Sequence, residues 1–410
     1  RFGMSEDTMK KYKVQNLTHF SGPALAKRTW LYRFYYDVIV GGGWLSQLER
    51  LHKVYGPVVR VGPKELHFAD PAAYADIYSS PAKLPKDLGL YEVFQFGLPP
   101  DLFTKEDPKA HAVIKSRLVS FFSRQAILKL EHAIQEQLRQ KPGRHPSKHA
   151  SRILLIQVTL PSNTRISTVS TKESQPSSDL ARITCGARFC APTSYGGITD
   201  YDLEDQNVFY TVIRNARDKG QSEHQVTREY LICEGLDLRI AGSETVGNAC
   251  YVGARCLIRD DRVGGKLTTE LDEAWPDRDA PMPLERLEKF PYLTAAIKES
   301  LRLSHGVVTP MTRIVPDSGV TITGHFVPPK TVVWMANTFV HLNADIFPEP
   351  NRFYPERWTE AKDRSLDKYL LPFGKGPRSC LAINLGWSEL YLILGNVFRK
   401  LELNSASDLG

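Results

Sequence analysis

One cysteine, Cys380, stands in the stretch "PFGKGPRSCLAINLG" (372–386), between a glycine loop that carries an arginine and a run of apolar residues. After the cysteine, apolar residues recur at helical spacing, which predicts a buried helix. At or just before a helix N-terminus, unpaired N–H groups and the dipole favour an anion and lower a thiol pKa, so we expect a thiolate. Such a thiolate suits a metal whose surroundings carry negative charge. A buried, inert cysteine is the alternative on the thiol alone.

The pattern Phe-x-x-Gly-x-Arg-x-Cys is met by Phe373, Gly376, Arg378 and Cys380. It resembles the haem-binding loop of the cytochromes P450, and thiolate-ligated haem is the known use of such a site. The resemblance implies haem b (iron protoporphyrin IX) as cofactor and Cys380 as the iron ligand. Phe373, Gly376 and Arg378 are then expected to bind the cofactor.

Three charged residues extend the resemblance. The stretch "KESLR" places Glu299 and Arg302 one helical turn apart, where alone they would be a surface pair that contributes roughly 0.2–0.5 kcal/mol. Arg357, in "FPEPNRFYPERW", resembles the arginine that joins this pair in the family. A carboxylate between two guanidinium groups can satisfy bidentate geometry in a buried place. We expect these three residues to act in folding and haem retention.

The stretch "AGSETV" (241–246) resembles the motif on the oxygen side of the haem in the same family. There, Ala241 and Gly242 would open a groove in a long helix. Thr245 would hydrogen-bond the bound oxygen or its water, and Glu244 would help to relay protons. For a Ser-x-Thr sequence taken alone, a local bond to the helix backbone is the usual alternative.

The haem propionates need cations, and the resemblance names four candidates. Arg378 is one, and Arg313 in "MTRIVPDSG" is another. His111 and Lys115 match a spacing on an early helix, with Lys115 where arginine is usual, so the charge is kept and the bidentate fork is lost. An exposed helix face is the alternative for His111 and Lys115.

The elements that must position these residues follow from apolar periodicity. It predicts a helix over Trp30–Leu51, then a hairpin and a helix, two helices over 108–140 broken near Ser123, and a long helix over Val226–Arg259. A further helix is predicted over 283–304, followed by strands and turns over 319–337. The expected fold class is mainly α with small β-sheets, a cytochrome P450-like fold in one domain over 1–410.

Three features depart from the family pattern. Ala382 stands where glycine is usual; one methyl group is often tolerated there, and crowding of the porphyrin is the alternative. In "CEGLDLRI" (233–240), burying Glu234, Asp237 or Arg239 without partners would cost several kcal/mol, so that helix is expected to be rotated, solvated or unstable. Segment 141–200 is expected to be loop or poorly ordered. One hypothesis is that the distal half of the fold is incomplete, and another is that this region results from an altered or mis-spliced reading of the gene.

Composition bounds the class of protein. The chain has 410 residues, 42% of them hydrophobic, and a formal charge of +7, which gives little support to nucleic-acid binding. The six cysteines are too few for a disulfide scaffold and lack histidines at zinc-site spacing. No window of about 18 apolar residues occurs, so no transmembrane segment is predicted. Because the chain begins with Arg1, we expect that upstream sequence, with a membrane anchor as one candidate, is missing.

The function that the resemblance implies is a haem-thiolate monooxygenase that inserts one oxygen atom from O₂ into an apolar small molecule. Stretches such as "LHKVYGPVVRVGPKELHFADP" resemble the fungal branch that includes trichodiene oxygenase, which suggests a terpenoid or other secondary metabolite. Residues 90–96 and 307–310 are candidates to line the substrate pocket, with core packing as the equal alternative.

The expected electron donor is a flavoprotein of the NADPH–cytochrome P450 reductase type, for which basic residues such as Lys375 would form a docking face. We expect a monomer, placed at the cytosolic face of the endoplasmic reticulum membrane by resemblance. One rival hypothesis is a catalytically inactive haem-binding or apo remnant with a disrupted distal half. A Cys-dependent hydrolase is a third, and it lacks a histidine at convincing spacing to Cys380.

Overall fold

The structure, a computed structural model, describes residues 17–80, 84–95, 97–139, 208–219, 226–360 and 364–401. Helices make up most of these residues, and the strands form two small sheets, so the predicted fold class is confirmed. The predicted loop over 141–200 lies outside the described residues. The question of an incomplete distal half lies largely there as well.

The first part of the chain holds nine helical segments. They are α2 (Leu31–Phe34), the π-helical turn η1 (Tyr35–Ile39), α3 (Trp44–Tyr55), α4 (Ala73–Tyr78), α5 (Leu88–Tyr91), the 3-10 turn η2 (Glu92–Gln95), α6 (Pro108–Leu118), α7 (Arg124–Arg139) and α10 (Val208–Asp218) among the described residues. The later helical segments are α11 (Arg228–Arg259), α12 (Asp261–Ala274), α13 (Leu284–Leu287), α14 (Pro291–Ser304), α15 (Thr338–His341), α16 (Arg357–Glu360), η5 (Arg364–Tyr369), η6 (Gly376–Arg378) and α17 (Ile383–Lys400).

The prediction of one helix over Trp30–Leu51 is wrong. The helix ends after η1, and α3 begins only at Trp44. Between them Gly41 and Gly42 have φ values of 70° and 93°, a left-handed conformation that glycine adopts without strain and that ends a helix. Apolar periodicity alone does not register this break.

The predicted break near Ser123 is confirmed. Helix α6 starts at Pro108, a residue suited to the first helical position, and the Asp107 carboxylate caps it by accepting the Ala110 N–H at 2.6 Å. The Ser123 hydroxyl accepts the Ala126 N–H at 3.3 Å at the start of α7. The early helix that carries His111 and Lys115 is therefore α6.

The larger sheet has the strand order β1-β2-β6-β3. Its strands are β1 (Val58–Gly62), β2 (Glu65–Phe68), β3 (Arg313–Ile314) and β6 (Val332–Trp334), and β4 (Val320–Ile322) pairs with β5 (His325–Val327) in the second sheet. The β1–β2 hairpin is antiparallel, as predicted, whereas β2 pairs in parallel with β6, with Glu65 opposite Val332. The sheet thus joins the beginning of the chain to its last quarter, and it holds Arg313 on β3.

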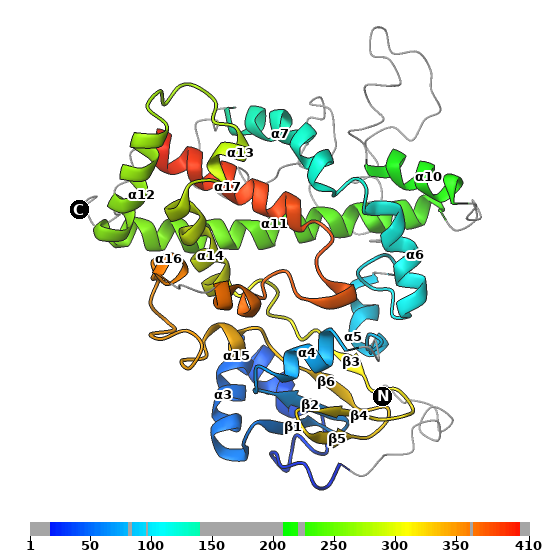
Figure 1. Cartoon of the computed structure of the whole chain (residues 1–410). Helices are drawn as coiled ribbons and strands as arrows, with labels where there is room; N and C mark the ends of the chain where they lie inside the picture. The colour runs from blue at the N-terminus through cyan, green and yellow to red at the C-terminus, as the bar shows by residue number, and fades with distance from the viewer. Residues whose placement is uncertain are drawn as a thin grey trace, which may run out of the picture.

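The largest apolar core lies between α11, α14 and α17, which cross the middle of the molecule in Figure 1. Helix α11 runs lengthwise through this part, and α17 lies along it. A second core fills the space between the sheets and α4. Gly253 marks the crossing of α11 and α14, since a Cβ atom there would stand 2.2 Å from the Ser300 hydroxyl. This close approach requires a glycine at position 253 of α11.

The long helix predicted over Val226–Arg259 is confirmed, with bounds of Arg228–Arg259. The stretch 233–240, whose charges led us to expect a rotated, solvated or unstable helix, is part of this continuous helix. Glu234 is buried, but its carboxylate accepts the Tyr230 hydroxyl at 2.7 Å and the Leu102 N–H at 2.9 Å, while Arg239 is exposed. Within the described residues, no helix combines the length and the apolar character needed to cross a membrane.

Candidate functional site

The loop before α17 holds Cys380. Its backbone N–H donates to the Phe373 carbonyl at 2.8 Å, which closes the loop over η6. Helix α17 begins at Ile383, so the cysteine lies three residues before the helix, as the sequence predicts. Phe373 is partly buried against the helical core, with its ring 6.1 Å from that of Trp387. The loop is thus tied to the helix that follows it.

Gly376 fits where no other residue would. Its φ is 75°, and a Cβ atom would stand 2.2 Å from the Tyr78 carbonyl oxygen at the end of α4. Gly374 has a φ of 65°, but the nearest atom to its Cβ position is 3.9 Å away. The two glycines of the cysteine loop therefore serve different purposes. Gly376 allows the loop to pack closely on α4, whereas Gly374 only allows the backbone to turn.

The thiol of Cys380 is exposed, but surrounding protein atoms still desolvate it. This desolvation raises the pKa of the Cys380 thiol, although the Ala382 N–H and the Lys115 ammonium act in the opposite direction. The prediction of a lowered thiol pKa is therefore wrong for the protein alone, because loss of solvation outweighs the helix terminus. A metal would be needed to hold the sulfur as a thiolate.

Glu299, Arg302 and Arg357 come together as predicted. Arg302 donates to both carboxylate oxygens of Glu299 (2.7 and 2.9 Å), and Arg357 Nε donates to Oε1 at 3.1 Å. Glu299 and Arg302 are fully buried. Trp358 Nε1 and the Tyr354 N–H complete the set of donors to Glu299, at 2.9 and 3.0 Å. The group fastens α14 to the segment around α16.

Arg302 extends this group further. Its Nη1 donates to the backbone carbonyls of His341 at 2.7 Å and Pro350 at 2.6 Å. His341 in turn accepts the Leu371 N–H on Nε2 at 2.9 Å, just before the cysteine loop. The buried ion pair is thus connected through α15 to the loop that carries Cys380, which supports the structural part assigned to it from the sequence.

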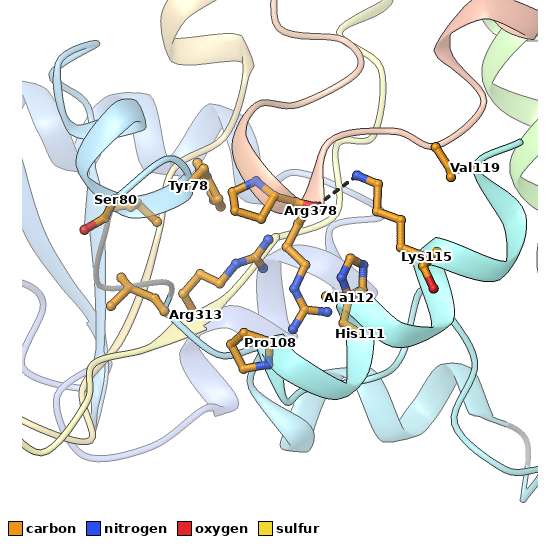
Figure 2. Close-up of a pocket in the computed structure, with 13 residues that line it drawn as sticks. Tyr78, Ser80, Pro108, His111, Ala112, Lys115, Val119, Arg313 and Arg378 are labelled. Carbon is orange, nitrogen blue, oxygen red and sulfur yellow. Dashed lines mark hydrogen bonds between the residues drawn. The ribbon is translucent and has the colours of Figure 1, made fainter. Parts of the chain in front are cut away.

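The predicted propionate cations line one cavity of about 290 Å³. Arg313 reaches it from β3, His111 and Lys115 from α6, and Arg378 from η6 (Figure 2). Burial, and then the charge of Arg313, lowers the pKa of Arg378 to about 10. Burial, and then Arg378, lowers the pKa of His111 to about 3, which keeps its imidazole neutral. The cluster is strongly positive and suits an anionic group.

The three cationic side chains also donate to backbone carbonyls. Arg378 donates to the carbonyls of Lys105 and Glu106, both at 2.5 Å, and Arg313 donates to the Thr312 carbonyl at 2.9 Å and the Tyr91 hydroxyl at 3.2 Å. Lys115 takes a different position. Its ammonium donates to Pro377 O at 3.0 Å and Ser379 O at 3.5 Å, so it fastens the cysteine loop to α6 (Figure 2).

Ala241, Gly242, Glu244 and Thr245 are exposed in the middle of α11. The Thr245 hydroxyl donates to the Ala241 carbonyl at 2.7 Å, so the local backbone bond that was the alternative is the one present here. A Cβ atom on Gly242 would meet nothing within 4 Å, which leaves open space beside the helix. One residue further on, Val246 lies 3.9 Å from the Cβ position of Gly386 on α17. This places the motif next to the helix that follows Cys380.

A family model described as Cytochrome P450 matches residues 198–408, about half of the chain. The tryptophan 6-hydroxylase of Fusarium equiseti is 31% identical over 96% of this chain and 87% of its own length. The chain belongs to the cytochrome P450 family. Other relatives are a cytochrome P450 monooxygenase of Ascocoryne sarcoides, 28% identical over 95% of this chain and 87% of its own, and the conidiogenone synthase of Penicillium rubens, 29% identical over 96% and 89%.

The relatives are fungal cytochrome P450 monooxygenases, so the enzyme class predicted from the sequence is confirmed. The narrower likeness to trichodiene oxygenase stays a prediction. Membership of the cytochrome P450 family implies a haem. The residues present fit that group, because the loop that carries Cys380 lines a cavity together with the cations Lys115 and Arg313, and a glycine-bearing face of α11 borders open space. No group of three or more potential metal-binding side chains occurs within the described ranges.

Lys86 is a buried lysine near Arg313 and Arg378 that the sequence did not reveal. Its ammonium is buried, lies 4.6 Å from the Tyr91 ring centre and 4.7 Å from that of Phe103, and donates to the Phe103 carbonyl. Lys86 also forms a β-bridge with Arg313. Desolvation, and then Arg378 and Arg313, holds its pKa well below the usual range. A lone lysine in "LPKD" carries no pattern that would have identified it.

Proposed function

We propose that this chain is a haem-thiolate monooxygenase in which haem b binds to Cys380 and an apolar small molecule is oxidised. The observation that carries the proposal is the meeting of the closed cysteine loop with the cation-lined cavity. When bound, the haem supplies the activation of O₂, with a thiolate that pushes electron density towards O–O cleavage. The protein supplies the pocket, the anchoring charges and the protons.

The roles of the chain's own residues follow from their positions. Arg313, Arg378 and His111 would bind the propionates, and Lys115 would hold the cysteine loop in place. Thr245 can exchange its bond to the Ala241 carbonyl for a bond to a ligand in the open space beside α11, which would let its hydroxyl pass a proton. Glu244 lies next to it and is exposed to solvent, as a proton source should be.

The proposed substrate class is an apolar secondary metabolite, such as a terpenoid. Support comes from Val307 and Val308, which follow α14 and are 38% and 49% exposed, as apolar residues that line a pocket would be. Leu90, the first residue of the other predicted pocket segment, is half-buried, and Phe96, its last residue, lies outside the described residues. The relatives' names include a tryptophan hydroxylase, so an indole is the competing substrate class.

The proposed electron donor is a flavoprotein reductase that uses NADPH, and the proposed location is the cytosolic face of the endoplasmic reticulum. Lys375, suggested as part of the docking face, donates to the Lys368 carbonyl and is half-buried. Desolvation, and then Lys368, lowers the pKa of Lys375. Lys368 itself is exposed and would contribute more directly to contact with an acidic partner.

The decisive experiment is the reduced carbon-monoxide spectrum of the purified, haem-supplied chain. A thiolate-type Soret band in the wild type and its loss in Cys380→Ser would support the proposal. Retention of the band in Cys380→Ser would refute the ligand assignment. The inactive remnant stays the alternative function: it would bind haem without NADPH-dependent turnover when reductase is added.

A further inference from the structure

Residues 101–107, which we call the 101–107 loop, are held against α11 by buried polar contacts. Asp101 is fully buried, and its carboxylate accepts the Thr104 N–H and hydroxyl, both at 2.7 Å. The Cys233 thiol donates to the other oxygen of Asp101 at 3.1 Å. The Leu102 N–H donates to Glu234, also on α11. The loop therefore rests on two consecutive residues of the long helix.

A second carboxyl group, that of Asp237, faces Asp101 from the next turn of α11. Asp237 Oδ2 is buried, and no donor among the described residues reaches it. Burial, and then Asp101, raises the pKa of Asp237 to about 8. Two facing carboxylates repel each other, whereas one proton between them makes a hydrogen bond that satisfies both. At neutral pH this proton is present.

Other titratable groups surround this pair without replacing the proton. Burial raises the pKa of Glu234 to about 7. Burial, and then Asp101, raises the pKa of the Cys233 thiol, and burial, and then Glu234, raises the pKa of Tyr230. Lys86 lies on the segment before α5 and Arg117 on α6, and these cations act on Asp237 and Glu234 respectively. The pKa of Lys86 is itself well below its usual value, so it is a weak counter-charge.

The opposite side of the 101–107 loop carries the cations of the haem site. Its Phe103 carbonyl accepts a hydrogen bond from the Lys86 ammonium, its Lys105 carbonyl accepts one from Arg378 Nη1, and its Glu106 carbonyl accepts one from Arg378 Nη2. Movement of this loop would therefore displace Arg378. The loop connects α11, which carries Thr245, to the charge that stands two residues before Cys380.

We propose that Asp101 and Asp237 hold one proton between their carboxyl groups and so position the 101–107 loop. Through the loop, this pair keeps Arg378 in place to bind the haem, so the inference rests on the function proposed above. When the proton leaves to solvent, two like charges face each other, and the loop separates from α11 with its grip on Arg378 weakened. Asp101 and Asp237 are positioning residues, since neither touches the cofactor.

The sign of the pH dependence follows from linkage. In an open loop, Asp237 is solvated and titrates near its usual value of about 4. Between about pH 4 and about pH 8, each rise of one pH unit therefore increases the ratio of open to closed loop by up to tenfold. Above about pH 8 this ratio levels off. Haem should be released faster in the same range.

The test measures transfer of haem from the loaded chain to excess apomyoglobin at pH 6, 7, 8 and 9. Asp237→Asn keeps the shape of the side chain and provides a neutral amide that donates to Asp101. We expect the ratio of wild-type to Asp237→Asn release rates to rise by up to tenfold per pH unit from pH 6 to 8 and then to level off. Using the ratio cancels titrations that both proteins share.

The matched control is Glu229→Gln, an exposed residue on the same helix, which should follow the wild type at every pH. A flat ratio for Asp237→Asn, or an equal change in Glu229→Gln, would overturn the inference. A second variant, Cys233→Ala, removes one donor to Asp101 and leaves Asp237 in place. Its haem release should be faster than that of the wild type, with the same dependence on pH. Unchanged haem release in Cys233→Ala would count against the loop contact, and this test remains if Asp237→Asn does not fold. A wild type that binds no haem would instead overturn the proposed function.

Discussion

Glu299 shows what a buried carboxylate requires of its surroundings. Both of its oxygens accept hydrogen bonds, from Arg302, Arg357, Trp358 and the Tyr354 backbone, and it has no exposed surface. The charge is stable only because every lone pair that faces protein has a donor. Any change that replaces an acceptor by a donor would leave two cations buried without a counter-charge.

We predict that Glu299→Gln lowers the free energy of unfolding by about 3–5 kcal/mol, because the new amide donates towards Arg302 and Arg357. Denaturant unfolding would measure this. Glu349→Gln is the matched control: its pair with Arg352 is exposed (68% and 49%), so its loss should cost about 0–1 kcal/mol. Equal costs in the two variants would contradict the structural part assigned to Glu299.

The glycines of the cysteine loop give a second comparison at this scale. Gly376→Ala places a methyl group against the Tyr78 carbonyl, so the loop must move, and both stability and haem content should fall. Gly374→Ala meets no close atom and should cost only the left-handed backbone strain of about 1–2 kcal/mol. Unfolding curves and the haem-to-protein ratio would separate the two. Similar behaviour of both variants would show that the close approach to α4 is unimportant.

Helix α11 is the element on which the proposed chemistry depends. It presents two hydroxyls that make the same local bond: Ser243 to the Arg239 carbonyl and Thr245 to the Ala241 carbonyl, both at 2.7 Å. Thr245 is exposed next to Ala241 and Gly242, where the family motif places the oxygen side of the haem. The pair offers an internal comparison of two hydroxyls with equal backbone effects.

We predict that Thr245→Ala diverts electrons from product to peroxide, with about tenfold or more less product per NADPH, because a proton donor is lost. The ratio of peroxide formed to NADPH consumed, in a system reconstituted with reductase, would measure this. Ser243→Ala should leave the ratio as in the wild type. If both variants uncouple alike, the effect belongs to the helix backbone and not to a proton donor.

Elements with a regular period and a capping residue could be predicted from the sequence. Helix α11 was found despite its glycines, and α6 and α7 were separated correctly near Ser123. The break between η1 and α3 was missed, because Gly41 and Gly42 act through backbone conformation and leave the apolar period intact. Pairings between distant elements, such as Glu234 with Leu102, depend on tertiary contacts that periodicity does not encode.

The candidate site shows the same division. Motif spacing identified Glu299, Arg302 and Arg357, and the structure joins all three. It could not identify Lys86, whose place is set by aromatic rings and a distant strand. The sequence pattern also predicted a lowered pKa for the Cys380 thiol. In the folded chain, desolvation by surrounding protein atoms raises this pKa by more than the helix terminus lowers it. Sequence patterns report residue types, whereas the degree of desolvation belongs to the folded chain.

At the scale of the whole molecule, histidines kept neutral by burial contribute to the response to acid. Desolvation lowers the pKa of five described histidines: His52, His67, His111, His305 and His341. Their stabilising effect is present above about pH 6.5, the value for an unfolded chain, and is lost as pH falls towards the lower folded values. These five histidines therefore lower the stability on mild acidification, whereas Glu234, Asp237 and Glu389, whose carboxyl pKa values are raised by burial, act in the opposite direction.

His305 tests this prediction, since its pKa is lowered to about 4 and it caps α14 with a φ of 62°. Asparagine tolerates that conformation and does not titrate, so His305→Asn should remove up to about 2 kcal/mol of the stability loss between pH 7 and pH 5. Denaturant unfolding at both pH values would measure the difference. The control is His132→Asn on α7, where the side chain is exposed, and it should lose as much stability between pH 7 and pH 5 as the wild type does. If His305→Asn also loses as much stability as the wild type, the explanation is wrong.

The parallel pairing of β2 with β6 has a consequence for biosynthesis. Glu65 accepts the indole N–H of Trp334 at 2.6 Å, although 269 residues separate them. While the ribosome is still making the middle of the polypeptide, the first hairpin has an open edge that other nascent chains can join. Completion of the sheet must wait until β6 has been translated, so the hairpin of β1 and β2 is made early but protected late.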